Sequence, residues 1–347
     1  MSNDPKDPLP LPWRPAPPPE PLTDWSPAAL DRAPMPRLAG PSDEDVFTLT
    51  PPPRERWVRH AVLLALTLVS TTYFGGFHYV GFLFDFGADA PVVSTGQFWT
   101  GGLWYSLTIL AILGCHEMGH YLACRYYRVS ATLPYFLPAP VLTGTLGAFI
   151  RIRERIPTKQ ALFDIGIAGP LAGFVVAVPA LFVGVAMSRV VALPDEFVGF
   201  ELGEPLLFRA AAWLLFGPIA DGYSLNLHPM AFAAWFGLLA TALNLFPVGQ
   251  LDGGHIAYAV LGRRSSLITI GMIVIAIGLT VFSLSWLVWT VLMIGMLVAF
   301  GPHHPATLDD VTPVDRTRVT LALVAAVIFI ICFTPAPIEP LEIIRPR

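Results

Sequence analysis

The feature that most constrains this chain is a polar motif in the middle of an apolar stretch. The stretch covers residues 98–127, which is long enough to cross a bilayer as a helix. Inside it, His116, Glu117 and His120 form the pattern HExxH. On a helix, two histidines four positions apart point to the same side and can bind one metal ion. Such groups in a membrane helix must face a protein interior or a wet cavity, which indicates a functional site.

Glu117 offers the chemistry that a hydrolytic metal site needs. A bound zinc ion polarises a water molecule, and a carboxylate beside it can take the proton. This division of roles is typical of metalloproteases with the HExxH pattern. The alternative is a buried polar network that ties helices together, but it explains neither the spacing of the histidines nor the glutamate.

The composition predicts a membrane protein. Of the 347 residues, 54% are hydrophobic and only 13% are charged. The mean hydropathy is +0.61, far from the average of soluble proteins. The net charge of −4 is small and the few basic residues lie next to apolar segments, so we expect no nucleic-acid partner. The three cysteines all fall in candidate spans, which predicts no disulfide framework.

Changes in composition divide the chain into four parts. Residues 1–56 are rich in proline and are predicted to form a disordered cytosolic tail. Residues 57–96 contain a first span and a loop, residues 97–262 a catalytic membrane core, and residues 263–347 the last spans and a tail. Arginines beside the spans place the N-terminus in the cytosol. We therefore predict an all-α polytopic membrane protein with about seven transmembrane helices, two of them within 265–300.

The segment 131–153 is predicted to be the exception to the helical pattern. It is apolar but contains three prolines and two glycines, and its end is rich in residues that favour strands. Non-helical backbone at membrane depth must be covered by protein or water, so we predict a small re-entrant β hairpin near the metal site. Its edge could pair with an extended peptide, which makes Gly144 and Gly147 candidate substrate-binding residues. A plain cytosolic loop is the alternative.

A second polar motif interrupts the apolar span 229–260. The sequence LNLFPVGQLDGGH contains a proline and three glycines, so the helix should break at membrane depth. Asp252 lies in this break and would complete a zinc centre with one position open to water. Asn244 could bind a substrate backbone or a developing oxyanion. His255 competes with Asp252 as a ligand, and a helix-capping role for Asp252 is a further alternative.

Other polar residues are predicted to lie outside the metal site. Asp164 begins a span and is expected to be a surface or capping acid. Residues His303 and His304 could bind a metal, but a solvated loop explains them as well. Small residues at helical spacing over 163–173 are expected to let helices pack closely.

Together, these motifs resemble those of the site-2 protease family of intramembrane zinc metalloproteases, peptidase family M50. The resemblance rests on HEMGH at 116–120, TGTLGAF at 143–149, and Asn244-Leu245-Phe246-Pro247 followed by Leu251-Asp252-Gly253. It covers residues 98–261. It implies that zinc is bound by His116, His120 and Asp252. It also implies that Glu117 is the general base and that Asn244 contacts the substrate.

The resemblance implies a setting as well as a site. Members of this family cleave transmembrane segments of regulatory proteins, so the implied partners are a transmembrane protein substrate and the lipid bilayer. We expect a multi-pass protein of a bacterial inner membrane with its N-terminus in the cytosol. The stretch GPHHPATLDD at 301–310 also resembles a subgroup related to plastid homologues.

Two other functions are compatible with part of the pattern. A membrane transporter of metal ions or protons also carries His, Asp and Glu in its spans. It does not need a glutamate beside His116, and no inverted repeat is apparent in the sequence. A catalytically inactive module that holds membrane helices is the other rival, and the intact Glu117 argues against it. The sequence therefore predicts an intramembrane zinc metalloprotease, with the transporter as the alternative.

Overall fold

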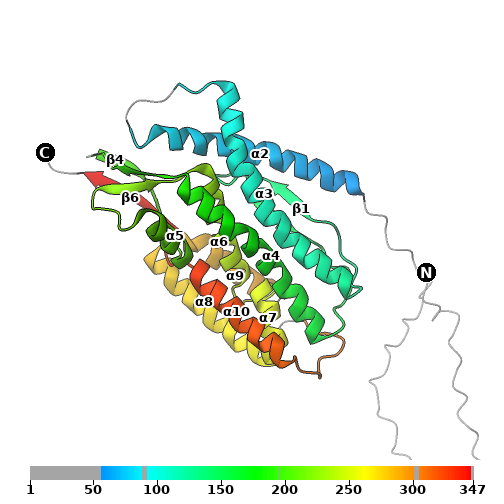
Figure 1. Ribbon diagram of the computed structural model, residues 1–347. Coiled ribbons are helices and arrows are strands. Elements are labelled where there is room, and N and C mark those ends of the chain that lie inside the picture. Colours follow the sequence, from blue (N-terminus) through cyan, green and yellow to red (C-terminus); the bar gives the residue numbers. More distant parts are fainter. Residues whose placement is uncertain (1–55, 88–91, 195, 301–304, 345–347) are drawn as a thin grey trace, which may run out of the picture. The chain divides into compact units, whose positions relative to one another are not determined.

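The computed structural model describes residues 56–87, 92–194, 196–300 and 305–344 (Figure 1). The predicted tail at 1–56 lies outside the described residues except for Arg56, and so do His303 and His304. Most of the described chain is helical, as predicted.

Four helical segments are long and apolar enough to cross a membrane. They are α2 (Trp57–Phe84), α3 (Thr95–Tyr126), α4 (Lys159–Ala186), and the run Asp252–Phe282 made of α7 (Asp252–Leu261), η2 (Gly262–Arg264) and α8 (Ser265–Phe282). The other helices are shorter: α5 (Leu206–Phe216), α6 (Pro229–Asn244), α9 (Trp286–Phe300) and α10 (Arg316–Cys332). The predicted polytopic helical architecture is thus confirmed in its main features, including a turn between α8 and α9.

Local side chains fix where the central helices begin. Ser94 and Gln97 form a reciprocal capping box at the start of α3. Thr158 caps α4 by accepting a hydrogen bond from the amide of Ala161 at 3.1 Å. A capping role for Asp164 is therefore wrong, because Asp164 lies on the second turn of α4, where it pairs with Arg318 of α10.

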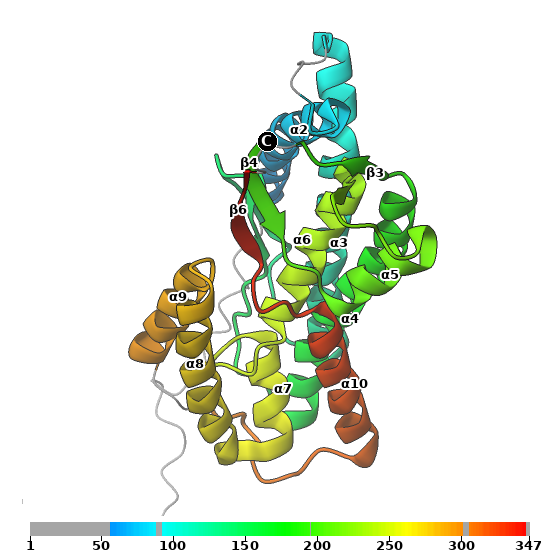
Figure 2. The ribbon, with the colours of Figure 1, turned by 90° about the vertical axis from the view of Figure 1, so that its left-hand side faces the viewer.

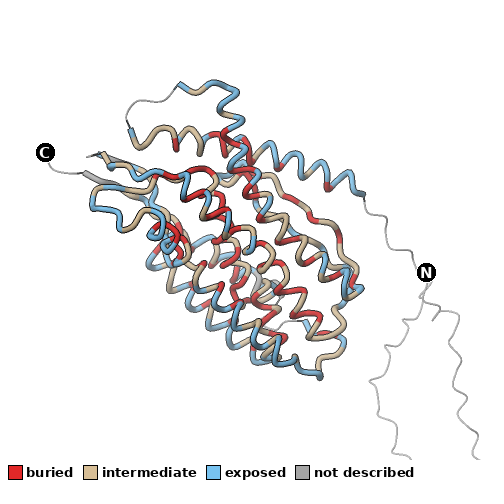
Figure 3. The backbone as a smooth tube through the Cα atoms, viewed as in Figure 1, coloured by how far each residue is buried: buried red, intermediate tan, exposed pale blue. Residues whose placement is uncertain are grey.

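The core lies where α3, α4, α6 and α7 pack together (Figures 1 and 2). Its largest fully buried side chains include Tyr105, Phe163 and Trp235. Half of the most apolar window of α4 is buried, against 22% in the run Asp252–Phe282. Figure 3 shows the same contrast, with buried residues along the central helices and many exposed residues on α8. Many apolar side chains of α8 are exposed, whereas α4 is the central helix.

The predicted hairpin is present and runs alongside α2. Strand β1 (Tyr135–Pro138) pairs antiparallel with β2 (Thr145–Phe149), with an irregularity between Phe136 and Pro138. His60 contacts the carbonyl of Pro134, and His78 donates to the carbonyl of Leu142 at 3.0 Å. These two histidines are 18 residues apart on α2, which corresponds to about 27 Å along a helix. The hairpin therefore extends along most of α2, while its re-entrant position in a membrane stays a prediction.

Two further antiparallel ribbons were not predicted. Strand β3 (Arg189–Ala192) pairs with β5 (Tyr223–Asn226), and β4 (Glu196–Leu202) pairs with β6 (Ile338–Ile344). Figure 2 shows β4 and β6 side by side. The second ribbon joins the loop after α4 to the segment after α10. At the other end of the helices, an isolated bridge joins Thr158, just before α4, to Asp309, which precedes α10.

Candidate metal centre

Three side chains predicted as metal ligands lie together, although they come from distant segments. His116 and His120 are on α3, and Asp252 is the first residue of α7. The two Nε2 atoms are 3.1 Å apart, and each is 3.2 Å from Oδ2 of Asp252. In a tetrahedral zinc site with bonds of about 2.0 Å, neighbouring ligand atoms are about 3.3 Å apart. The triangle therefore fits one face of such a centre.

A helix break brings Asp252 to α3. Helix α6 ends at Asn244 and α7 starts at Asp252, so the predicted interruption is confirmed. Gly253 and Gly254 pack directly on the backbone carbonyls of Leu245 and Gly249, where a Cβ atom would overlap them. Glycine at these two positions lets the start of α7 fold back tightly on the break. Asp252 is consequently held by packed backbone rather than by a free loop.

Glycines of α4 make room for the two imidazoles. A Cβ atom on Gly169 would overlap the ring of His120, and one on Gly173 would lie 3.1 Å from Cβ of His116. We predicted that small residues here would let helices approach each other. The structure adds a more specific reason, because the groups packed against them are the candidate ligands.

The orientation of His120 is set by the backbone of α4. Its Nδ1 donates a hydrogen bond to the carbonyl of Ile165 at 2.7 Å, and this group is buried. A carbonyl can only accept, so the proton is on Nδ1 and Nε2 is free to bind a metal. The sequence did not predict this role of Ile165. No sequence signal could have identified it, because the contact uses a carbonyl that every residue has.

Glu117 and Asn244 border the same space. Oε1 of Glu117 is 3.9 Å from Nε2 of His116, and the Glu117 side chain is buried. The amide of Ile150, directly after β2, contacts the Glu117 carboxylate. Nδ2 of Asn244 is 3.3 Å from Nε2 of His116. A carboxylate and a side-chain amide thus lie next to the ligand triangle.

The two hairpin glycines differ in their surroundings. Gly144 has a φ of +70°, and a Cβ atom there would lie 2.6 Å from Cα of Thr71. Its carbonyl accepts a hydrogen bond from Ser70 at 2.6 Å. Gly147 on β2 has a φ of +101°, and a Cβ atom there would meet nothing within 4 Å. Gly144 therefore faces α2, whereas space beside Gly147 is open.

His255, the competing ligand, lies outside the triangle. Its Cβ atom faces Gly166 of α4, at 3.0 Å from where a Cβ atom would stand on that glycine. Across the residues that the structure describes, one group of His, Cys, Asp and Glu is close enough to hold an ion. That group is His116, His120 and Asp252.

The fold and this triangle define a polytopic membrane protein with a candidate zinc centre built on an HExxH helix. Residues 104–285 match the sequence model of peptidase family M50. The chain belongs to that family, and the resemblance predicted from its motifs is confirmed. The matched part includes every predicted site residue.

Several named plant proteins are similar to this chain. "Probable zinc metalloprotease EGY2, chloroplastic" from Oryza sativa subsp. indica is 31% identical over 255 residues, which cover 70% of this chain and 44% of the relative. The protein of the same name from Arabidopsis thaliana is 30% identical, covering 68% and 42%. "Probable zinc metalloprotease EGY1, chloroplastic" from Arabidopsis thaliana is 32% identical, covering 65% and 42%. The chain spans less than half the length of these relatives.

Proposed function

We propose that this protein is an intramembrane zinc metalloprotease that hydrolyses peptide bonds within transmembrane segments of other proteins. The observation that carries the proposal is the ligand triangle of tetrahedral dimensions beside Glu117, in a member of peptidase family M50. The names of the similar plant proteins agree with it. Neither the family nor these names support a transporter. We propose residues 97–262 as the catalytic core, within the matched region 104–285.

Zinc would be held by His116, His120 and Asp252. When bound, it supplies a Lewis acid that polarises the scissile carbonyl and a water molecule. The carboxylate of Asp252 offsets part of the charge of the ion in a low-dielectric site, which two neutral imidazoles alone cannot do.

Glu117 is the proposed general base. Its carboxylate lies beside the triangle, where it can take a proton from water and later give it to the leaving amine. Asn244 is proposed to bind the substrate backbone or the developing oxyanion, since its Nδ2 atom lies 3.3 Å from Nε2 of His116. These two side chains therefore divide proton transfer and charge stabilisation between them.

The substrate must reach the site in an extended form. A transmembrane helix hides its carbonyls in internal hydrogen bonds, so it has to unwind locally before hydrolysis. We propose that the unwound segment pairs with the hairpin near Gly147, where the surroundings are open. Gly144 would contribute indirectly, by holding the hairpin against α2.

Removing zinc should abolish the activity. Membrane proteomes of cells with the wild-type protein and with Glu117→Gln should differ in the fragments of a membrane substrate. That substrate and the full chain would then be reconstituted in liposomes. A zinc chelator should lower cleavage at least about 10²-fold, and added zinc should restore it. Cleavage that continues once elemental analysis finds no zinc would contradict the proposal.

We further propose seven membrane crossings, with α6 and α7 as one broken crossing and α8 as the next, so that the run Asp252–Phe282 is divided at η2. The bridge between Thr158 and Asp309 supports a common side for the start of α4 and the loop before α10. The pairing of β4 with β6 supports a common side for the loop after α4 and the segment after α10. The arginines near the spans assign the first side to the cytosol. We propose a bacterial inner membrane as the location of this protein. The word "chloroplastic" in the names of the plant relatives refers to those proteins.

This topology predicts the side of the C-terminal tail. A reporter fused after Arg347 should be active outside the cytosol, because seven crossings separate it from a cytosolic N-terminus. The same reporter inserted between Arg263 and Arg264 should be cytosolic and serves as the control. A cytosolic reporter at Arg347 would contradict seven crossings, because either 265–300 forms one crossing or another boundary is wrong.

A further inference from the structure

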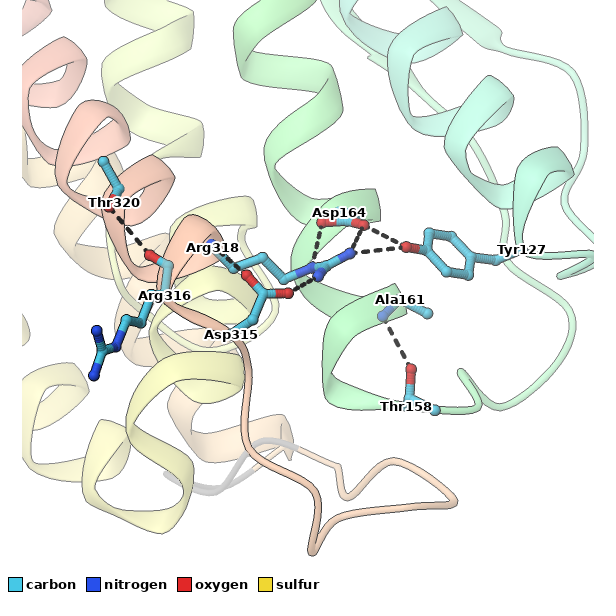
Figure 4. A network of polar contacts seen from close by, with 8 residues as sticks. All are labelled: Tyr127, Thr158, Ala161, Asp164, Asp315, Arg316, Arg318 and Thr320. Carbon is cyan, nitrogen blue, oxygen red and sulfur yellow. Dashed lines mark hydrogen bonds and ion pairs between the residues drawn. The ribbon is translucent and has the colours of Figure 1, made fainter.

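Arg318 of α10 is the centre of a polar network near the start of α4 and the end of α3 (Figure 4). Its Nε donates to Oδ1 of Asp164 at 2.8 Å, and one terminal nitrogen donates to Oδ2 of Asp164 at 2.5 Å. That nitrogen is also 3.2 Å from the hydroxyl of Tyr127, which in turn donates to Asp164. The other terminal nitrogen pairs with Asp315. One guanidinium thus joins α10, α4 and the end of α3.

Partial burial and paired hydrogen bonds restrict the movement of the Arg318 and Asp164 side chains. The side chains of Arg318 and Asp164 are 19% and 27% exposed. Two parallel hydrogen bonds between a guanidinium and a carboxylate fix both position and angle, which a single contact does not. Burial and the neighbouring Asp164 raise the pKa of Tyr127, so its hydroxyl remains a donor. The network therefore helps to fix the position of the end of α3 relative to the start of α4.

The network lies next to the residue that orients a candidate ligand. Asp164 directly precedes Ile165, whose carbonyl accepts the hydrogen bond from Nδ1 of His120. Tyr127 follows His120 on the other helix by seven residues, or about two turns. A shift of the first turns of α4 would therefore move the Ile165 carbonyl relative to His120.

We propose that Arg318 is a positioning residue of the metal centre, which holds the Ile165 carbonyl against His120 through its bidentate contact with Asp164. This inference rests on the proposed metal site and concerns a residue outside the part matched to the family, residues 104–285. The Ile165 carbonyl is in direct contact with the candidate metal ligand His120. Arg318 does not touch His120 and acts through Asp164.

The loop before α10 also contacts α4 and α7 at a second point, through Asp310. Nζ of Lys159 donates to the carbonyl of Asp310 at 2.7 Å. The hydroxyl of Tyr258 on α7 donates to the Asp310 carboxylate at 2.9 Å. If this second attachment alone were enough to hold α4, removing Arg318 would leave the metal site unchanged.

Metal binding by the purified full chain in detergent provides the test. Arg318→Ala should lower zinc affinity about tenfold, the low end for a change outside the ligand set. It should also change the visible absorption of the Co²⁺-loaded protein, which reports ligand geometry. Arg316→Ala is the matched control, since it removes the same charge from the same helix. Figure 4 shows Arg316 directed away from Asp164, so both properties should stay at wild-type values.

Two further variants test the route through Asp164. Asp164→Asn should reproduce the effects of Arg318→Ala, and the double variant should be no worse than either single one. Arg318→Lys keeps the charge without the planar fork and should give an intermediate affinity. These milder variants, measured on monodisperse protein, decide the question if Arg318→Ala does not fold.

Wild-type zinc affinity and Co²⁺ absorption in Arg318→Ala would overturn the inference. Equal losses in Arg316→Ala would do so too, because they would indicate a general charge effect. Additive losses in the double variant would show that Arg318 does not act through Asp164. If the wild-type chain itself bound no stoichiometric zinc, the proposed function would fail instead.

Discussion

Glu117→Gln should reduce cleavage of a membrane substrate by at least about 10²-fold while the protein keeps its zinc. Glutamine has nearly the same size and can still form hydrogen bonds, but it cannot accept the proton from water. The Glu117 side chain is buried beside the triangle without belonging to it, so its loss should leave the ligands in place. Cleavage rate and zinc content, measured on the same reconstituted sample, check both parts of the prediction.

The control for this variant is Glu204→Gln. Glu204 is exposed in the loop before α5 and undergoes the same chemical change far along the chain from the HExxH motif. It should cleave at the wild-type rate. Undiminished cleavage by Glu117→Gln would show that Glu117 is not the general base. Loss of both cleavage and zinc would show that Glu117 belongs to the metal site.

Asp252→Asn should lose zinc, and His255→Ala should keep it. Oδ2 of Asp252 lies 3.2 Å from both candidate imidazole ligands, and asparagine at this position would remove the negative charge that a zinc ion requires there. We expect zinc affinity to fall more than about 10²-fold, beyond the range for residues outside the ligand set. His255 packs against α4 and lies outside the triangle, so its removal should change zinc affinity little.

Elemental analysis of the purified variants measures this difference directly. The pair is matched because both residues lie within the first turn of α7, so a general disturbance of that helix would affect them alike. Zinc loss in His255→Ala with retention in Asp252→Asn would make His255 the third ligand. Zinc retained by both variants would show that the two histidines of α3 suffice.

The parts of the site that sequence predicted are those with a local signal. HExxH places two histidines on one face of a helix. The break between α6 and α7 can be recognised from its proline and glycines. The hairpin was predictable because prolines excluded a helix over 131–153. Asp252 was predicted as the third ligand because a carboxylate in a membrane span needs a charged partner. Its short distances to His116 and His120 agree with that prediction.

The parts that sequence did not predict depend on contacts between distant residues. The role of the Ile165 carbonyl is independent of the side chain, so it leaves no trace in the sequence. Gly169 looked like an ordinary packing residue because the spacing that admits a helix also admits an imidazole. Asp164 is separated from Arg318 by 154 residues, and no local rule joins them. Ribbons β3–β5 and β4–β6 are short and lack a connecting turn that would reveal their pairing.

The pairing of β4 with β6 has a consequence for how the protein is made. Leu202 pairs with Ile338, and the helices α5 to α10 lie between them in the chain. Synthesis proceeds from the N-terminus, so the ribosome will have produced all three candidate ligands well before Arg318 and β6 emerge. At that stage the nascent chain contains the three candidate ligands but lacks the contact of α10 with Asp164 and the pairing of β4 with β6. If Arg318 positions the metal centre as proposed, zinc affinity should reach its full value only after α10 has packed against α4.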